Sequence, residues 1–239
     1  MTFGMINPAR VALASAFTAL ALAVLAGCSF QPEEKIWEIS GPAFGTSYHI
    51  NVVLTEDQAR LETLASGIDE VLEGVDASMS TWRDDSELSL FNRRSDQSKW
   101  IPVSAELFEV LQKAEEVSMM TDGAFDITIG PLVNLWGFGP QARPEQIPSE
   151  ESRAEALAAT GFEKLELRSD PPAVRAAPPQ YLDLSAIAKG YGVDAVAHFL
   201  ESEGVEAYLV EIGGEVRVNA GNPHPAANKG ANPWQSPPV

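Results

Sequence analysis

The stretch Glu206-Ala-Tyr-Leu-Val-Glu-Ile-Gly-Gly-Glu-Val-Arg-Val218 contains two short runs rich in Val, Ile and Tyr. The first run extends from Glu206 to Ile212 and the second from Glu215 to Val218, and Gly213-Gly214 joins them. β-Branched and aromatic residues favour strands, and a two-glycine connection accepts the positive φ angles of a tight hairpin turn. The stretch therefore predicts two adjacent antiparallel strands.

Strands and helices alternate outward from this hairpin. Residues 47–54 alternate apolar and polar side chains, which predicts a half-buried strand, and residues 164–168 and 181–184 are also predicted to be strands. Helical spacing of apolar residues follows over 61–79, and further helices are predicted from Ser104, between Ser149 and Gly161, and over 187–202. The whole predicts an α+β domain with a largely antiparallel sheet flanked by helices.

Composition excludes several classes of function. The 239-residue chain is 45% apolar, enough for a folded core, and its formal charge of −18 argues against a nonspecific grip on nucleic-acid phosphates. Cys28 is the only cysteine, so the chain has neither an internal disulfide nor a zinc site built on paired cysteines. Its three histidines, at 49, 198 and 224, are too scattered to suggest a metal cluster.

Residues 1–27 are predicted to be a lipoprotein signal peptide. Arg10 precedes an apolar run from Val11 to Ala26, which has the length of a signal-peptide core and is short for a membrane span. The run ends in Leu25-Ala26-Gly27-Cys28, which resembles the bacterial lipoprotein signal whose cysteine is lipidated and becomes the new N-terminus. A plain secretory signal is the alternative. We expect lipidated Cys28 and a tether over residues 28–40.

Charge and composition also predict how the chain is attached and how it ends. A body this acidic would not adhere unaided to an anionic bilayer, so the lipid chains are expected to be its membrane attachment. The expected location is the bacterial cell envelope, on the periplasmic side of the inner membrane. Residues 220–239 contain five prolines and several Asn and Gly residues, a composition that predicts a disordered tail.

Four segments carry residues suited to binding. Residues 121–139 interleave glycines, two acids and large aromatics, a pattern that fits either a flat ligand or a turn-rich crossing of the core. Residues 183–194 lead from a predicted strand into a helix through small residues. Asp183 is suited to Mg²⁺ or a hydroxyl, and Lys189 in the first turns of the helix is suited to a phosphate. Phe44-Gly45-Thr46 and Met79-Ser80-Thr81-Trp82 place aromatics beside hydroxyls, which also occurs in ordinary core contacts.

Taken together, these segments resemble the ApbE family, the FAD:protein FMN transferases, over residues 41–219. The resemblance rests on the order of five motifs: Gly45-Thr46, Met79-Ser80-Thr81-Trp82 with Asp85-Ser86-Glu87-Leu88, the 122–139 segment, the 183–194 segment, and Gly213-Gly214-Glu215. It implies transfer of FMN from FAD to a Ser or Thr of a target flavoprotein with release of AMP, in a reaction that needs Mg²⁺. The partners would be FAD and the acceptor flavoprotein, with no nucleic acid.

The resemblance also implies site residues, although it assigns no catalytic residue. The positions that match the family's FAD contacts are Phe44 (usually Met in the family), Trp82, Ala124, Phe125, Asp126, Asp183 and Lys189. The position matching Ala186 gives Mg²⁺ a backbone carbonyl. The family's later Asp and Thr, which complete the Mg²⁺ shell, have no counterpart after Asn232-Pro233-Trp234, so the domain is expected to be C-terminally truncated. A non-catalytic flavin-binding or interaction lipoprotein and an FAD pyrophosphatase giving FMN and AMP are the alternatives.

Overall fold

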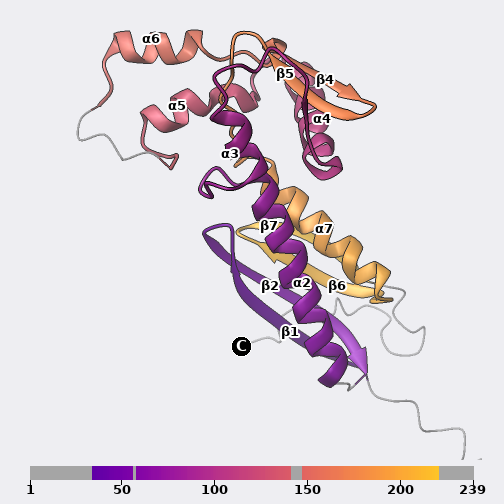
Figure 1. Ribbon diagram of the computed structural model, residues 1–239. Coiled ribbons are helices and arrows are strands. Elements are labelled where there is room, and N and C mark those ends of the chain that lie inside the picture. Colours follow the sequence, from indigo (N-terminus) through magenta and orange to yellow (C-terminus); the bar gives the residue numbers. More distant parts are fainter. Residues whose placement is uncertain (1–33, 56–57, 141–146, 221–239) are drawn as a thin grey trace, which may run out of the picture.

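The computed structural model describes residues 34–55, 58–140 and 147–220 (Figure 1). The elements, in chain order, are β1 (Glu34–Ala43), β2 (Thr46–Thr55), α2 (Gln58–Met79), α3 (Glu87–Asn92), β3 (Ile101–Pro102), α4 (Ala105–Met120), the 3₁₀ turn η1 (Ile127–Ile129), α5 (Gly130–Leu135), α6 (Glu150–Ala158), η2 (Phe162–Lys164), β4 (Leu165–Ser169), β5 (Pro172–Ala176), α7 (Ala188–Ser202), β6 (Ala207–Ile212) and β7 (Glu215–Ala220). Every strand pair is antiparallel, so the predicted α+β class is confirmed.

Four strands in the order β1-β2-β6-β7 form the larger sheet, and α2 and α7 lie along one of its faces (Figure 1). The predicted alternation in β2 is present, because every second side chain from Tyr48 to Leu54 is buried. These side chains pack against the first part of α2 and the middle of α7. Removing this apolar surface from water, at about 25 cal/mol per Å², is what holds the two helices on the sheet.

Both hairpins of the larger sheet turn at the same end. Phe44-Gly45 connects β1 to β2 and Gly213-Gly214 connects β6 to β7, and all four residues have positive φ. Two-residue turns of this kind match the twist of the flanking strands. The N–H of Gly213 donates to the carbonyl of Ser47 at 3.2 Å, so the two turns lie side by side.

A second, smaller sheet in the order β3-β5-β4 packs with α3 and α4 around a second core. Helix α2 contributes to both cores, with Leu64 and Ile68 in the first and Val75 and Met79 in the second. The N-terminal part of α7 also reaches the second core. The two long helices therefore join the two halves of the fold, and the site described below lies along them.

Two expectations from the sequence are wrong. Residues 181–184 form no strand, because the backbone of Leu182 exchanges two hydrogen bonds of 2.8 Å with the side chain of Asn92 instead of joining a ladder. The strand that pairs with β4 is β5. The tether was expected to reach residue 40, but residues 34–40 belong to β1, which pairs with β2 along its whole length.

The other expectations about the chain ends lie outside the described residues. These are the signal peptide over 1–27, Cys28 and the tail over 220–239, of which only Ala220 is described, as the last residue of β7. Within the described ranges, no helix is both long and apolar enough to cross a bilayer.

Candidate functional site

A cavity of about 1080 Å³ lies where the two cores meet, with Leu72 of the first core and Val75 of the second in its walls. Its walls come from the β1–β2 turn, the second half of α2, residues 80–83, the start of α7 and the β6–β7 turn. Three residues predicted from the resemblance line it, namely Phe44, Trp82 and Lys189. Segments far apart in the sequence thus converge on one space that can hold a sizeable ligand.

Phe44 is held in this wall against the preference of its backbone. Its φ is 50°, in the left-handed region that bulky residues rarely occupy. The ring packs against both cores and lies over Gly192 of α7, where an added Cβ would come within 2.8 Å of the ring. Contact with both cores and a glycine beneath the ring together compensate for the strained turn.

Lys189 provides a positive charge in the first turn of α7. Its Nζ donates to the carbonyl of Gly213 at 3.3 Å, which directs the ammonium group toward the hairpin turns. In the part of the chain that the structure describes, no carboxylate forms an ion pair with it. An ammonium group held by a carbonyl at the wall of a cavity is suited to an anionic ligand.

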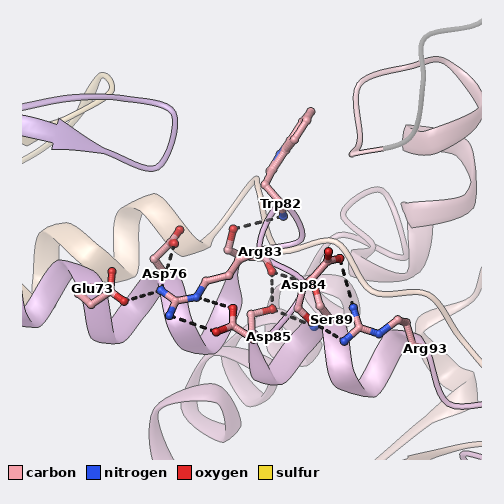
Figure 2. Close-up of polar contacts among 10 residues, drawn as sticks. Glu73, Asp76, Trp82, Arg83, Asp84, Asp85, Ser89 and Arg93 are labelled. Atoms are coloured by element: carbon pink, nitrogen blue, oxygen red, sulfur yellow. Dashed lines mark hydrogen bonds and ion pairs between the residues drawn. The ribbon is translucent and has the colours of Figure 1, made fainter.

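The wall formed by α2 is acidic, because Asp69, Glu73 and Asp76 follow one face of that helix. Asp69 accepts a hydrogen bond of 2.8 Å from the hydroxyl of Tyr48, and burial together with this bond raises the pKa of Tyr48 to about 12. Glu73 and Asp76 contact Arg83, whose guanidinium reaches back from the residues that follow the helix (Figure 2). The two cations of the cavity therefore differ: Lys189 bonds to a backbone carbonyl, whereas Arg83 is paired with carboxylates.

Asp183 and Ala186 lie just before α7, beside the cavity. Asp183 is buried, and its Oδ1 accepts a hydrogen bond of 2.9 Å from the N–H of Ser185, a residue that lines the cavity. Ala186 is exposed, and among the described residues nothing donates a hydrogen bond to its carbonyl. A carboxylate and a backbone carbonyl without a hydrogen-bond donor are both oxygen ligands of the kind that Mg²⁺ prefers, so the chemistry of these residues fits the metal that the resemblance implies.

The residues predicted from the 121–139 segment do not line the cavity. Oδ1 of Asp126 accepts two hydrogen bonds of 2.7 Å from Thr128, and Oδ2 accepts one of 3.2 Å from the N–H of Phe162, so its carboxylate joins its own loop to η2. Phe125 packs against the second core and Ala124 is exposed. The segment reaches the site through its backbone, since the carbonyl of Ile127 accepts a hydrogen bond of 2.8 Å from the N–H of Asp183.

The acidic face of α2 and Arg83 were not predicted from the sequence. The signal for the acids was present, because residues 69, 73 and 76 recur at helical spacing on a helix that was correctly predicted. That they face a cavity depends on the position of α2 between the two cores, which no local pattern encodes.

Comparison with known proteins identifies the family. The model of the ApbE family matches residues 44–235. The chain belongs to the ApbE family. This span contains the cavity walls from Phe44 to Gly213, so the site lies in the part of the chain that carries the family's pattern.

Curated members of the ApbE family with similar sequences carry the name FAD:protein FMN transferase. The chain is 44% identical to the one from Vibrio cholerae over 225 residues, which cover 94% of this chain and 63% of that protein. It is 40% identical to the one from Haemophilus influenzae, covering 93% of this chain and 64% of that protein. The chain therefore spans just under two thirds of the length of these relatives.

Solved ApbE structures show the same fold. The flavin transferase ApbE from Vibrio cholerae superposes with a TM-score of 0.73 at 43% identity, covering 78% of this chain and 60% of that one. The apo flavinyl transferase ApbE from Pseudomonas stutzeri gives a TM-score of 0.72 at 36% identity, covering 78% and 61%. The chain thus shares its fold with solved members of the family.

Proposed function

We propose that the protein transfers FMN from FAD to a Ser or Thr hydroxyl of an acceptor flavoprotein and releases AMP. The name shared by the similar relatives supports this reaction. The observation that carries it is the cavity of about 1080 Å³ in which Phe44, Trp82 and Lys189 converge. Aromatic surface and an ammonium group in one space suit a ligand that combines flat rings with a pyrophosphate.

Each wall has a distinct task in this proposal. Trp82 at the rim and Phe44 in the turn offer flat apolar surface to the rings of FAD, while Lys189 faces the pyrophosphate. The acceptor's hydroxyl oxygen attacks the FMN phosphorus in line and gives up its proton to solvent, the bond from that phosphorus to the bridging oxygen breaks, and AMP leaves with that oxygen. Lys189 favours this step because it offsets the negative charge that gathers on the phosphates.

Mg²⁺ belongs to the same proposal. The carbonyl of Ala186 and the carboxylate of Asp183 would hold it beside the start of α7. When bound, Mg²⁺ would neutralise charge on the pyrophosphate and so assist departure of AMP. The buried position of Asp183 and its bond to the N–H of Ser185 keep the carboxylate oriented whether or not the metal is present.

The experiment that tests the function follows the fate of FAD. The protein is incubated with FAD, Mg²⁺ and an acceptor domain that carries a Thr at its flavinylation site, and the products are separated by denaturing electrophoresis and chromatography. We expect covalent flavin fluorescence on the acceptor and equimolar AMP, and an acceptor with Ala in place of Thr should stay unlabelled. Free FMN and AMP would instead indicate a pyrophosphatase, and bound but unchanged FAD a binding protein; either result would overturn the proposal.

We further propose that lipids on Cys28 attach the protein to the periplasmic side of the inner membrane. The sequence Leu25-Ala26-Gly27 before the only cysteine supports this. Replacing Cys28 by Ala should move the protein from the membrane fraction to the soluble periplasmic fraction. A Cys28→Ala protein that still sediments quantitatively with membranes would contradict the lipid anchor.

A further inference from the structure

Trp82 is the most solvent-exposed tryptophan described, with 68% of its surface accessible, and it lies at the rim of the cavity. Figure 2 shows its ring directed away from the polar cluster beneath it. No hydrogen bond to the indole is present among the described residues. A large aromatic ring left in water beside a cavity needs its orientation fixed by something other than its own contacts.

The backbone just before Trp82 is fixed by hydroxyl groups. Ser86 and Ser89, both buried, donate through Oγ to the carbonyl of Ser80, at 2.5 and 3.1 Å. The hydroxyl of Ser80 accepts the N–H of Trp82 at 3.2 Å. These bonds hold the start of the loop between α2 and α3 against the start of α3.

Arg83, the next residue, ties this loop to α2. Its Nη1 lies 2.5 Å from Glu73 Oε1 and 3.7 Å from Asp76 Oδ2, and its Nε donates to Asp85 Oδ1 at 2.7 Å. The hydrogen bonds that Arg83 donates to Asp85 and Glu73 raise its pKa above the ordinary value, and the guanidinium lowers the pKa of Asp85. One side chain thus connects α2 to Asp85, on the C-terminal side of Trp82.

A second arginine fixes the far side of the turn. Arg93 of the loop after α3 contacts both the side chain and the carbonyl of Asp84, with Nη1 3.4 Å from Oδ1. Residues 83 and 84 are therefore each anchored, and Trp82 is displayed from a backbone held on both sides (Figure 2).

From these contacts we infer that Arg83 is a positioning residue, which orients the Trp82 ring for stacking on the ligand and does not itself contact the phosphates. Although Arg83 lines the cavity, its guanidinium is engaged with three carboxylates, and a further anion would have to compete with them. Lys189 lacks such partners, so the two cations of the cavity have different tasks. The ligand in this inference is the FAD of the proposed function.

The inference makes a ligand-specific prediction. Arg83→Met should lower the affinity for FAD and for riboflavin by the same factor, about 10-fold, because both ligands carry the ring that stacks on Trp82. Arg83→Lys keeps the charge without the forked geometry and should give an intermediate loss. Arg175→Met is the matched control, since it removes an ion pair of 2.6 Å with Glu166 on the smaller sheet, away from the cavity, and should change neither affinity.

A measurement without ligand separates this inference from the proposed function. The five tryptophans are labelled with 5-fluorotryptophan, and the Trp82 signal is assigned from its loss in Trp82→Phe. We expect the ¹⁹F line of residue 82 to sharpen in Arg83→Met, as the ring gains motion, while the other lines and the circular dichroism spectrum stay unchanged. An unchanged Trp82 line would overturn the positioning role, whatever FAD does. So would a loss of FAD affinity with riboflavin affinity intact, because that pattern marks a direct phosphate contact.

Discussion

The two hairpin turns beside the cavity share one backbone geometry but differ in side chains. Gly213-Gly214 adopts positive φ without steric strain because glycine has no Cβ, whereas Phe44-Gly45 places a bulky aromatic residue at φ 50°. The Gly213 turn lets its neighbours come close, since an added Cβ would lie 2.7 Å from Thr46 Cγ2 and 3.3 Å from Lys189 Cδ. The Phe44 turn instead fills space.

This contrast indicates what each turn is for. Strain of this kind costs on the order of 1–3 kcal/mol and persists where surrounding contacts or function require the side chain. Phe44 packs on Gly192, reaches both cores and lines the cavity, so the contacts of its ring offset the strain of its backbone. Glycine is needed at position 213 because it has no Cβ, which lets Lys189 approach closely enough to bond to its carbonyl.

The largest expected effect comes from adding a side chain to the glycine turn. Gly213→Val adds a β-branched side chain at positive φ and forces it into Thr46, so we expect the free energy of unfolding to fall by about 3 kcal/mol. Gly214→Ala is the control, because its φ is 97° but nothing lies within 4 Å of an added Cβ. Chemical denaturation measures both. Equal losses in the two variants would show that the close approach at residue 213 is unimportant.

The next effect concerns the aromatic turn. Phe44→Ala should lower the free energy of unfolding by about 2 kcal/mol, less than for a fully buried phenylalanine because the ring is only partly buried. Phe44→Gly should be more stable than Phe44→Ala by about 1 kcal/mol, since glycine tolerates positive φ and alanine does not. Glycine is normally the less stable of the two in a strand. If Phe44→Ala proves the more stable variant, the turn is not strained.

The smallest effect concerns how each hairpin is attached to its helix. Tyr48 donates to Asp69 of α2 and Tyr208 donates to Glu201 of α7, and the pKa of both phenols is raised by burial and by the carboxylate. For Tyr48, between pH 10 and about 12 the unfolded phenol has lost its proton and the folded one has kept it. Stability should therefore fall as pH rises through this window.

The pH dependence is checked by denaturation at a series of alkaline pH values. Tyr48→Phe should lose stability less steeply than the unmodified protein in this window, and Tyr208→Phe should act in the same direction. A slope that is unchanged in Tyr48→Phe would mean that this phenol titrates alike in the folded and unfolded chain.

Much of the fold could be predicted because its signals are local. Gly213-Gly214 between two apolar runs marks a hairpin, and Ser104 and Ser149 cap α4 and α6 as their positions predict. Two segments without such signals were misread. β1 includes Pro42 and overlaps the predicted tether, and as an edge strand it tolerates the proline. β5 begins at Pro172 after Pro171.

The site was only partly predictable for a similar reason. Phe44, Trp82 and Lys189 come from separate motifs whose order matches the ApbE family, and the structure brings them to one cavity. The acids of α2 and the role of Arg83 depend on contacts across the fold, which periodicity cannot supply. Lys189 and Arg83 are both basic residues in or beside motifs of the family, and the sequence does not distinguish their roles. Their partners do, because Lys189 bonds to a backbone carbonyl whereas Arg83 is paired with carboxylates.

The most direct test of this account is the affinity of Lys189→Ala for FAD and for riboflavin, measured by calorimetric titration beside the unmodified protein. A lysine that contacts the pyrophosphate contributes about 1.5–3 kcal/mol through charge-assisted hydrogen bonds, so the affinity for FAD should fall at least 10-fold. Riboflavin has no phosphate, and its affinity should change less than about 2-fold. Equal losses for the two ligands, or no loss for FAD, would contradict the assignment of Lys189 to the phosphates and with it the proposed orientation of FAD in the cavity.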